Sequence, residues 1–301
     1  EMGEFGAKRR GDGVLVFARA HRAEWLGAMQ QAISEHLGQH LPAAAAALRW
    51  PSAADAGKPP GNFSLAEVVG VQPLCPDFLR VRLAAPDLHR LATEDSLHFR
   101  LVLPQPGDDA PEWPRLGANG QILWPRGDKA LHRPVYTFRA LDAGAGWADV
   151  DIFLHEGGRV TGWTGVATTG ETVGLMGPAG RALGEPDWIA LFGDETALPA
   201  ISRHLATLPR QTRGAAFILC DPADQQALDH PPGLRLHWLN RRAGDKLCAA
   251  LSDLHLPECA NRLVWFAAEK TQADRARTLL HEVRGLSRNE THVTAYWRLA
   301  S

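Results

Sequence analysis

The chain has 301 residues, a hydrophobic fraction of 45% and a formal net charge of −2 at pH 7. This length allows two domains with cores of their own, and the balanced charge argues against nucleic acid as a partner. No apolar run reaches the length of a membrane span, and charges and glycines occupy the first residues. We therefore expect a cytoplasmic protein without membrane insertion.

The cysteines argue against several common metal sites. Cys75, Cys220, Cys248 and Cys259 are scattered, without a Cys-x-x-Cys pair. This spacing argues against zinc, an iron-sulfur cluster or a redox disulfide. We expect buried free thiols and no metal ligands from the protein.

Residues 1–61 are expected to form a small accessory α/β segment followed by a linker. Residues 13–18 have a strand sequence, and residues 23–41 place apolar side chains at helical spacing. The stretch 41–63 is rich in alanine, proline and glycine, which is typical of a linker.

Residues 62–183 predict a β-rich domain. Short segments with β-favouring residues alternate with glycine- and proline-containing turns. The segments are residues 66–71, 78–83, 98–103, 136–140, 150–154 and 172–175. This spacing predicts a closed or nearly closed antiparallel β-barrel.

Residues 184–301 predict alternating strands and helices. Apolar runs at 189–192, 215–219, 234–239 and 263–267 are typical of buried parallel strands. Thr271 and Asp274 have the spacing of a capping box at the start of the last helix, and Gly285 follows its end. The pattern indicates a Rossmann-like nucleotide-binding domain, and the whole chain a β + α/β fold.

A motif in the barrel region, residues 132–139, has the chemistry of a flavin nucleotide site. Tyr136 offers an apolar face for stacking, and the Thr137 hydroxyl can donate and accept hydrogen bonds. Arg133 and Arg139 offer planar guanidinium groups for phosphate oxygens. Farther along, a Gly-Gly turn precedes residues 159–163 and can direct backbone amides at an anion. The same residues also suit an ordinary strand and hairpin.

A second motif, residues 193–200, follows the first strand of the C-terminal domain. A glycine at that strand end lets the backbone approach a ligand at the amino terminus of the next helix. The simpler interpretation is a helix capped by Thr196 with Pro199 in its first turn.

Residues after the next two strands bear on cofactor preference. Asp221 can bind a ribose hydroxyl, which favours NADH. Arg241 and Arg242 can accept a 2′-phosphate, which favours NADPH. We lean slightly to NADPH.

Four ordered motifs carry a family resemblance. They are residues 133–139 (RPVYTFR), 193–200 (GDETALPA), 264–269 (VWFAAE) and 296–298 (YWR). On these motifs the chain resembles the siderophore-interacting proteins, a branch of the ferredoxin reductase-like flavoenzymes that reduce ferric siderophores. The resemblance covers roughly residues 63–298 and implies that the barrel binds FAD and the second domain NADPH or NADH.

The resemblance also implies roles for single residues. Tyr136 would stack on the flavin, Thr137 would lie near its reactive nitrogen, and Thr196 would face the nicotinamide. Glu269 and Trp297 would lie near the flavin and the substrate mouth. The expected catalytic residues are thus Tyr136, Thr137, Thr196 and Glu269. The expected cofactor-binding residues are Arg133, Pro134, Val135, Tyr136, Thr137, Arg139, His155, Gly158, Val160, Thr161, Trp163, Gly193, Asp194, Glu195, Thr196, Asp221, Arg241 and Trp297.

The sequence departs from the family pattern in three places. Arg133 lies three residues before Tyr136, where many relatives have two. Thr161 stands where serine is common and keeps the hydroxyl. Ala268 replaces a glycine before Glu269, so the backbone there approaches its ligand less closely.

The implied substrate is a ferric siderophore, and the protein is expected to act as a monomer. Catecholate siderophores are anionic, so we expect cationic side chains at the mouth, with Lys270, Arg298 and Lys129 as candidates. Each is otherwise a solvated surface charge. His98 and His155, near strand ends, are expected to be packed or hydrogen-bonded.

The reaction implied is FAD-dependent reduction of siderophore-bound Fe(III) to Fe(II) by NAD(P)H. Two alternatives stay open. One is a general flavin diaphorase acting on quinones, free flavin or an electron-carrier protein. The other is a non-enzymatic module that binds a ferric siderophore.

Overall fold

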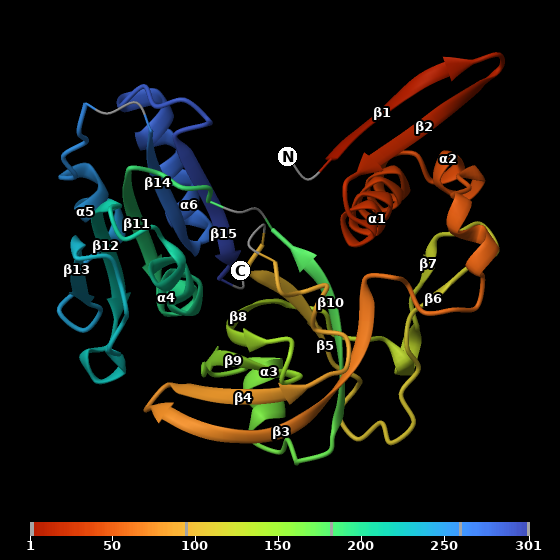
Figure 1. Ribbon diagram of the computed structural model, residues 1–301, viewed down its shortest axis with the longest axis horizontal. Helices are drawn as coiled ribbons and strands as arrows, with labels where there is room; N and C mark the ends of the chain where they lie inside the picture. Colours follow the sequence, from red (N-terminus) through yellow and green to blue (C-terminus); the bar gives the residue numbers. More distant parts are fainter. Residues whose placement is uncertain (1–2, 94–95, 181–182, 259–260, 300–301) are drawn as a thin grey trace.

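The computed structural model describes residues 3–93, 96–180, 183–258 and 261–299, and it consists of three parts (Figure 1). A closed six-stranded barrel lies in the middle, a five-stranded parallel sheet on one side and an N-terminal hairpin with helices on the other. This arrangement confirms the predicted β + α/β fold class. In the parts of the chain that the structure describes, no helix is long and apolar enough to cross a membrane.

The N-terminal part is a β-hairpin followed by helices. Its elements are β1 (Gly3–Arg10), β2 (Gly13–Ala20), α1 (Ala23–His40), α2 (Pro42–Ala47) and the 3₁₀ turn η1 (Pro51–Asp55). Helix α1 contacts barrel strand β10, and Trp50 Nε1 donates to Ser34 Oγ at 3.0 Å. The residues expected to be a linker therefore contain two short helical segments, because the alanine run between Pro42 and Ala47 favours helix.

The barrel is antiparallel and closes in the order β10-β3-β4-β9-β8-β5. Its strands are β3 (Phe63–Cys75), β4 (Phe78–Ala84), β5 (His98–Val102), β8 (Val135–Asp142), β9 (Trp147–Phe153) and β10 (Thr172–Ala179). Between β5 and β8 the chain forms the small hairpin β6 (Arg115–Leu116) and β7 (Ile122–Leu123) and the turn η2 (Gly127–Lys129). Alternating residues fill the interior, where Phe99 and Phe138 stack at a centroid distance of 3.8 Å. A short helix, α3 (Arg159–Thr164), follows β9.

The C-terminal domain has a parallel sheet in the order β13-β12-β11-β14-β15. The strands are β11 (Trp188–Asp194), β12 (Arg213–Cys220), β13 (Gly233–Asn240), β14 (Arg262–Glu269) and β15 (Thr291–Trp297). The helical elements are η3 (Glu195–Ala197), α4 (Leu198–Thr207), η4 (Pro222–Asp224), α5 (Leu247–Ser252), α6 (Lys270–Thr278) and the π-helical turn η5 (Leu279–Val283). The strands are buried and apolar because helices cover the sheet.

The expected capping box at Thr271 is wrong. Helix α6 begins one residue earlier, at Lys270, with Glu269 as its N-cap. The Glu269 carboxylate accepts hydrogen bonds from the backbone N–H groups of Thr271 at 2.6 Å and Gln272 at 3.3 Å. A carboxylate at this position also interacts favourably with the positive end of the helix dipole.

The described cysteines, Cys75, Cys220 and Cys248, are free. Cys220 is buried, whereas the other two are only half-buried. Burial raises the pKa of the Cys220 thiol to about 12, so this thiol stays protonated at neutral pH. Cys259 lies outside the described residues.

The two large domains are joined by hydrogen bonds as well as by packing. Helix α4 lies against β8, where Arg203 Nη1 donates to the Phe138 carbonyl at 2.7 Å. At the tip of the β3–β4 hairpin, the Asp77 backbone N–H donates to Asp224 Oδ1 at 2.9 Å. These contacts hold the C-terminal domain against β8, which carries most of the residue 132–139 motif, and against the β3–β4 hairpin.

A buried arginine, Arg90, stabilises the start of the barrel through several hydrogen bonds. The Arg90 side chain is 5% exposed and joins the loop after β4 to β3 and β10. Its partners are the carbonyls of Asn62, Leu175 and Gly177, the Ser64 hydroxyl and the Asp87 carboxylate. Burial lowers the pKa of Arg90, but these acceptors replace the water that the charged group loses.

We predict that Arg90→Ala lowers the free energy of unfolding by about 3 kcal/mol, because it leaves several buried carbonyls without a donor. Chemical denaturation followed by circular dichroism measures this change. Arg19→Ala is the control, since Arg19 is exposed, forms an ion pair with Glu4 and lies over the Phe17 ring at the surface, so its loss should cost less than about 1 kcal/mol. Equal effects of the two substitutions would contradict the role of Arg90.

Candidate active site

The motif residues 133–139 lie on β8 and on the residues just before it, next to β5. The register pairs His98 with Thr137 and Phe99 with Tyr136. Tyr136 packs against the barrel core, in the cluster that also contains Val160 and Trp163 of α3. Burial raises the pKa of the Tyr136 phenol, which stays protonated. Val135 is 53% exposed, as expected for alternating strand residues.

A cationic pocket of about 430 Å³ lies beside this strand. Three guanidinium groups line it, those of Arg100, Arg133 and Arg159, together with His132 and Pro134. Arg133 stacks over the Trp124 ring, with its guanidinium carbon 4.0 Å from the ring centroid. Arg100 Nη1 donates to the Arg133 carbonyl at 3.2 Å, and Arg159 Nη2 to the Pro104 carbonyl at 2.7 Å.

The charge of this pocket is poorly compensated by the protein itself. Among the described residues, none of its three arginines forms a salt bridge. Its one carboxylate is Glu35, which comes from α1 of the N-terminal part. Burial lowers the pKa of both Arg133 and His132. The arrangement has the chemistry of a site for an anion with several oxygens, such as a pyrophosphate.

The turn before α3 requires its two glycines for different reasons. Gly157 has φ +73°, a conformation that favours glycine. A Cβ at Gly158 would lie 2.7 Å from the His155 ring and 2.8 Å from Thr161 Oγ1. The Thr161 hydroxyl accepts a hydrogen bond from the His155 backbone N–H at 3.2 Å. The turn is therefore tightly packed around the start of α3. At the end of the helix, Trp163 Nε1 donates to Glu171 at 2.7 Å.

Arg139 does not line the cationic pocket. Its Nε lies 3.7 Å from Asp151 Oδ2, and Asp151 also binds Arg80 through both carboxylate oxygens at 2.7 and 2.8 Å. The structure thus separates the two arginines that the sequence places around Tyr136. A cofactor-binding role of Arg139 stays a prediction.

At the end of β11, a completely buried carboxylate organises the second motif. Asp194 Oδ1 accepts from the Thr196 backbone N–H at 3.0 Å and from its hydroxyl at 2.5 Å. Asp194 Oδ2 accepts from Trp297 Nε1 at 2.8 Å. Burial raises the pKa of Asp194, and these donors oppose that shift. Asp194, and not Thr196, caps the first helical turn, so the simpler interpretation with a threonine cap is wrong.

Gly193 is also explained by packing. A Cβ there would lie 2.6 Å from the Ala197 Cβ and 2.7 Å from the Ile201 Cδ1. The glycine lets the following helix pack closely on β11. These side chains fill the space on the Cβ side of Gly193, and a cofactor-binding role of its backbone stays a prediction.

Charged pairs occupy the neighbouring strand ends. The buried Glu195 carboxylate binds the Arg241 guanidinium through both oxygens, with an Nε–Oε1 distance of 2.5 Å. Asp221 accepts from the Ala223 backbone N–H at 3.0 Å and forms an ion pair with Arg242. The Arg242 side chain is 76% exposed, so it is the cation most accessible to a ligand at these strand ends.

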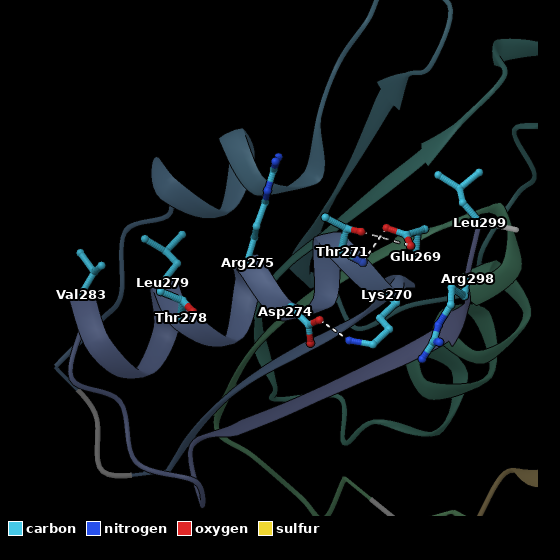
Figure 2. Close-up of a pocket in the computed structure, with 10 residues that line it drawn as sticks. All are labelled: Glu269, Lys270, Thr271, Asp274, Arg275, Thr278, Leu279, Val283, Arg298 and Leu299. Atoms are coloured by element: carbon cyan, nitrogen blue, oxygen red, sulfur yellow. Dashed lines mark hydrogen bonds and ion pairs between the residues drawn. The ribbon is translucent and has the colours of Figure 1, made fainter. Parts of the chain in front are cut away.

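A pocket of about 740 Å³ lies along α6 and contains two of the predicted substrate-binding residues (Figure 2). Lys270 and Arg298 both line it near the start of the helix, and Arg275 lines it farther along. Lys270 forms an ion pair with Asp274. Glu269 also lines the pocket. Lys129 does not: it is bound to Asp108 Oδ1 at 2.6 Å in the loop after β7.

His98 lies between the two domains, a position that the sequence did not reveal. His98 is hydrogen-bonded to Thr137 Oγ1 through Nδ1 at 3.0 Å and to the Tyr296 hydroxyl through Nε2 at 3.3 Å. Sequence reasoning expected His98 to be packed or hydrogen-bonded, and this is confirmed. It missed Arg100, His132 and Arg159 in the cationic pocket, although each lies in or next to a segment already singled out.

A closed antiparallel barrel followed by a parallel α/β sheet is the ferredoxin reductase-like fold. A ferredoxin NADP⁺ reductase from Neisseria gonorrhoeae shares this fold, with a TM-score of 0.52 and 12% identity over 79% of this chain and all of that one. The barrel, over residues 67–182, matches the model of the siderophore-interacting FAD-binding domain, and residues 186–300 match that of the siderophore-interacting protein.

Ferric vibriobactin reductase ViuB of Vibrio cholerae is 31% identical over 254 residues, which cover 77% of this chain and 92% of that protein. A siderophore utilization protein from T. fusca superposes with a TM-score of 0.71 and 31% identity, over 79% of this chain and 94% of that one. The chain belongs to the siderophore-interacting protein family.

FAD is the cofactor of this barrel domain, and the residues present fit it. The three arginines of the cationic pocket supply donors for a pyrophosphate, and the tightly packed turn at Gly158 leads into α3 beside the same strand. Tyr136 lies on β8 and packs in the same cluster as Val160 and Trp163 of α3. The roles of the individual residues stay predictions.

We predict that Arg133→Gln weakens FAD binding about tenfold or more, because it removes a charge-assisted contact to phosphate. Titration of the apoprotein with FAD, followed by quenching of flavin fluorescence, measures the dissociation constant. Arg126→Gln is the control, since this exposed arginine lies outside the pocket on the same loop. If the two substitutions have equal effects, the cationic pocket does not hold the cofactor.

Proposed function

We propose that this protein is an FAD-dependent NAD(P)H:ferric-siderophore oxidoreductase, which reduces siderophore-bound Fe(III) to Fe(II) for iron release. The observation that carries the proposal is geometric. A cationic pocket and Tyr136 lie on the barrel, and Thr137 next to Tyr136 is connected through His98 to the C-terminal strand of the nucleotide domain. The names of the relatives support it, since they include a ferric vibriobactin reductase and an NADPH-dependent ferric-chelate reductase from Escherichia coli.

On this proposal the barrel residues bind and orient FAD. Arg100, Arg133 and Arg159 bind its pyrophosphate, Tyr136 covers one face of the ring, and the Thr137 hydroxyl lies at the reactive nitrogen. Bound FAD supplies the conversion of a two-electron donor into a one-electron donor. The protein needs no general base, and the siderophore keeps the coordination shell of the iron.

The nucleotide domain binds and orients NADPH or NADH. The short turn fixed by Asp194 presents Thr196 to the nicotinamide, and Trp297 lies beside it through the same carboxylate. At the outer strand ends, the exposed Arg242 is suited to a 2′-phosphate, whereas the Asp221 carboxylate is suited to a ribose hydroxyl. Because Arg242 partly neutralises Asp221, we favour NADPH.

The pocket along α6 is our site for the ferric siderophore. Lys270, Arg275 and Arg298 outnumber the carboxylates of Glu269 and Asp274 that line it with them. This excess of positive charge favours an anionic complex. Fe(II) binds hard oxygen ligands less tightly than Fe(III), so reduction there loosens the iron.

We further propose the domain division 1–61, 62–183 and 184–301, and a monomer that acts in the cytoplasm. The family matches at 67–182 and 186–300 support the division. A monomer is supported because one chain supplies both sides of the Thr137, His98 and Tyr296 contact. The cytoplasm is where nicotinamide cofactors are maintained in reduced form.

Anaerobic stopped-flow absorption tests the proposed reaction. We predict that the protein, purified with FAD, loses its yellow colour when mixed with NADPH and regains it when a ferric catecholate siderophore is added. Quinones, free flavin and an electron-carrier protein are the comparison acceptors. If only these restore the colour, the protein is a general diaphorase. If it takes up no FAD, it is a binding module.

A second measurement tests the site at the outer strand ends. We predict that Arg242→Leu raises KM for NADPH about tenfold, since one contact to the 2′-phosphate is lost, and leaves KM for NADH within about twofold. Steady-state kinetics with each cofactor measure both values. Arg235→Leu, on an exposed position within β13, is the control. Equal changes for the two cofactors would show that Arg242 does not recognise the 2′-phosphate.

A further inference from the structure

His98 joins the barrel to the nucleotide domain through two hydrogen bonds in series. Its Nδ1 lies 3.0 Å from Thr137 Oγ1, on the neighbouring barrel strand β8. Its Nε2 lies 3.3 Å from the Tyr296 hydroxyl, on β15 of the nucleotide domain. A single imidazole thus connects the hydroxyl expected at the flavin with the strand that ends at Trp297.

The ring of His98 is held in place from several directions. The Tyr296 ring packs against it edge-on, with a centroid distance of 5.9 Å and an interplanar angle of 86°. On another side the chain passes so closely that a Cβ at Gly180 would lie 2.6 Å from the His98 Cδ2. Gly180 has φ +88°, so glycine is favoured there for its conformation as well. These contacts fix which nitrogen faces each partner.

The environment keeps this ring neutral. Burial lowers the pKa of His98 to about 4, the nearby His292 and Arg203 act in the same direction, and a hydrogen bond to the Tyr136 backbone opposes them. A neutral imidazole has one N–H donor and one acceptor nitrogen. Of its two hydroxyl partners, Thr137 and Tyr296, only one can therefore donate to the ring, and the other must accept.

The chemistry of the two hydroxyl groups decides which one accepts. A phenol is more acidic than the aliphatic hydroxyl of threonine, so it is the stronger donor. Burial raises the pKa of the Tyr296 phenol, which therefore keeps its hydrogen. Tyr296 donates to Nε2, the His98 Nδ1–H donates to Thr137 Oγ1, and the hydrogen of Thr137 is left free to point away from His98.

We propose that His98 is a positioning residue that makes the Thr137 hydroxyl a hydrogen-bond donor toward the FAD ring. This inference rests on the proposed function, in which Thr137 lies at the reactive nitrogen. That nitrogen carries no hydrogen in oxidised FAD and accepts a hydrogen bond, and a donor there favours the arrival of hydride. Tyr296 belongs to the nucleotide domain. The docking of that domain therefore sets the direction, or polarity, of the hydrogen bond between His98 and Thr137 on the barrel.

Nitrogen NMR of protein labelled in its histidine rings tests the polarity directly, with no activity involved. We expect His98 to show the neutral Nδ1–H form, and the signal is assigned by its absence from the His98→Asn variant. In Tyr296→Phe, which keeps the aromatic ring, the proton should move to Nε2. An Nε2–H form in the unsubstituted protein would overturn the proposal.

A double-substitution cycle separates positioning from mere structural support. We expect His98→Leu to slow reduction of bound FAD by NADPH about tenfold, the effect of one lost hydrogen bond, without weakening FAD binding. His98→Asn, whose amide can donate from the Nδ1 position, should restore most of the rate. In a Thr137→Val background, His98→Leu should have no further effect. An unchanged tenfold loss in that background would show that His98 does not act through Thr137.

These outcomes are independent of those for the proposed function. Suppose that the unsubstituted protein binds FAD and reduces ferric siderophores, and that the His98 variants reduce FAD at the same rate as the unsubstituted protein. Then only the inference about His98 fails. If the protein takes up no FAD, the proposed function fails, while the NMR result still reports the polarity of the Tyr296, His98 and Thr137 contacts.

Discussion

The arrangement of this protein depends on the fixed contact between the parallel sheet and the barrel. Neither domain contains all of the chemistry: the cationic pocket and Tyr136 belong to the barrel, whereas Asp194, Glu269 and Trp297 lie at or near strand ends in the sheet. Packing of α4 on β8 and the polar contacts of Arg203 and His98 bring the two sets together. Because these polar groups are buried or half-buried, their hydrogen bonds also exclude alternative docking positions, which would leave them unpaired.

Much of the fold could be predicted because its signals are local and periodic. Alternating residues in β4 and apolar runs in β11 identify a barrel and a buried parallel sheet. Helix starts were less predictable. Asp194 and Glu269 cap helical turns for which Thr196 and Thr271 were expected, since a capping residue is recognised by the conformation of its own backbone, which the spacing of polar residues does not determine.

Residues of the candidate site are also hard to predict from the sequence when they lie far apart along the chain. Tyr136, Thr137 and Arg133 are recognisable because they are neighbours in sequence. The cationic pocket is not, because its arginines come from β5, from the residues before β8 and from the start of α3. Arg139 shows the converse: it is close to Tyr136 in sequence, but β8 is bulged at this point, and the Arg139 side chain faces Asp151 instead of the cationic pocket.

The hydrogen bond between Trp297 and Asp194 adds a free-energy cost to any movement of Trp297, the last residue of β15, away from the sheet. The Asp194 carboxylate is completely buried, so withdrawal of the indole N–H would leave its Oδ2 without this donor. Such a loss costs about 1–3 kcal/mol. Any ligand that displaces the Trp297 indole from Asp194 must recover at least that much through its own contacts.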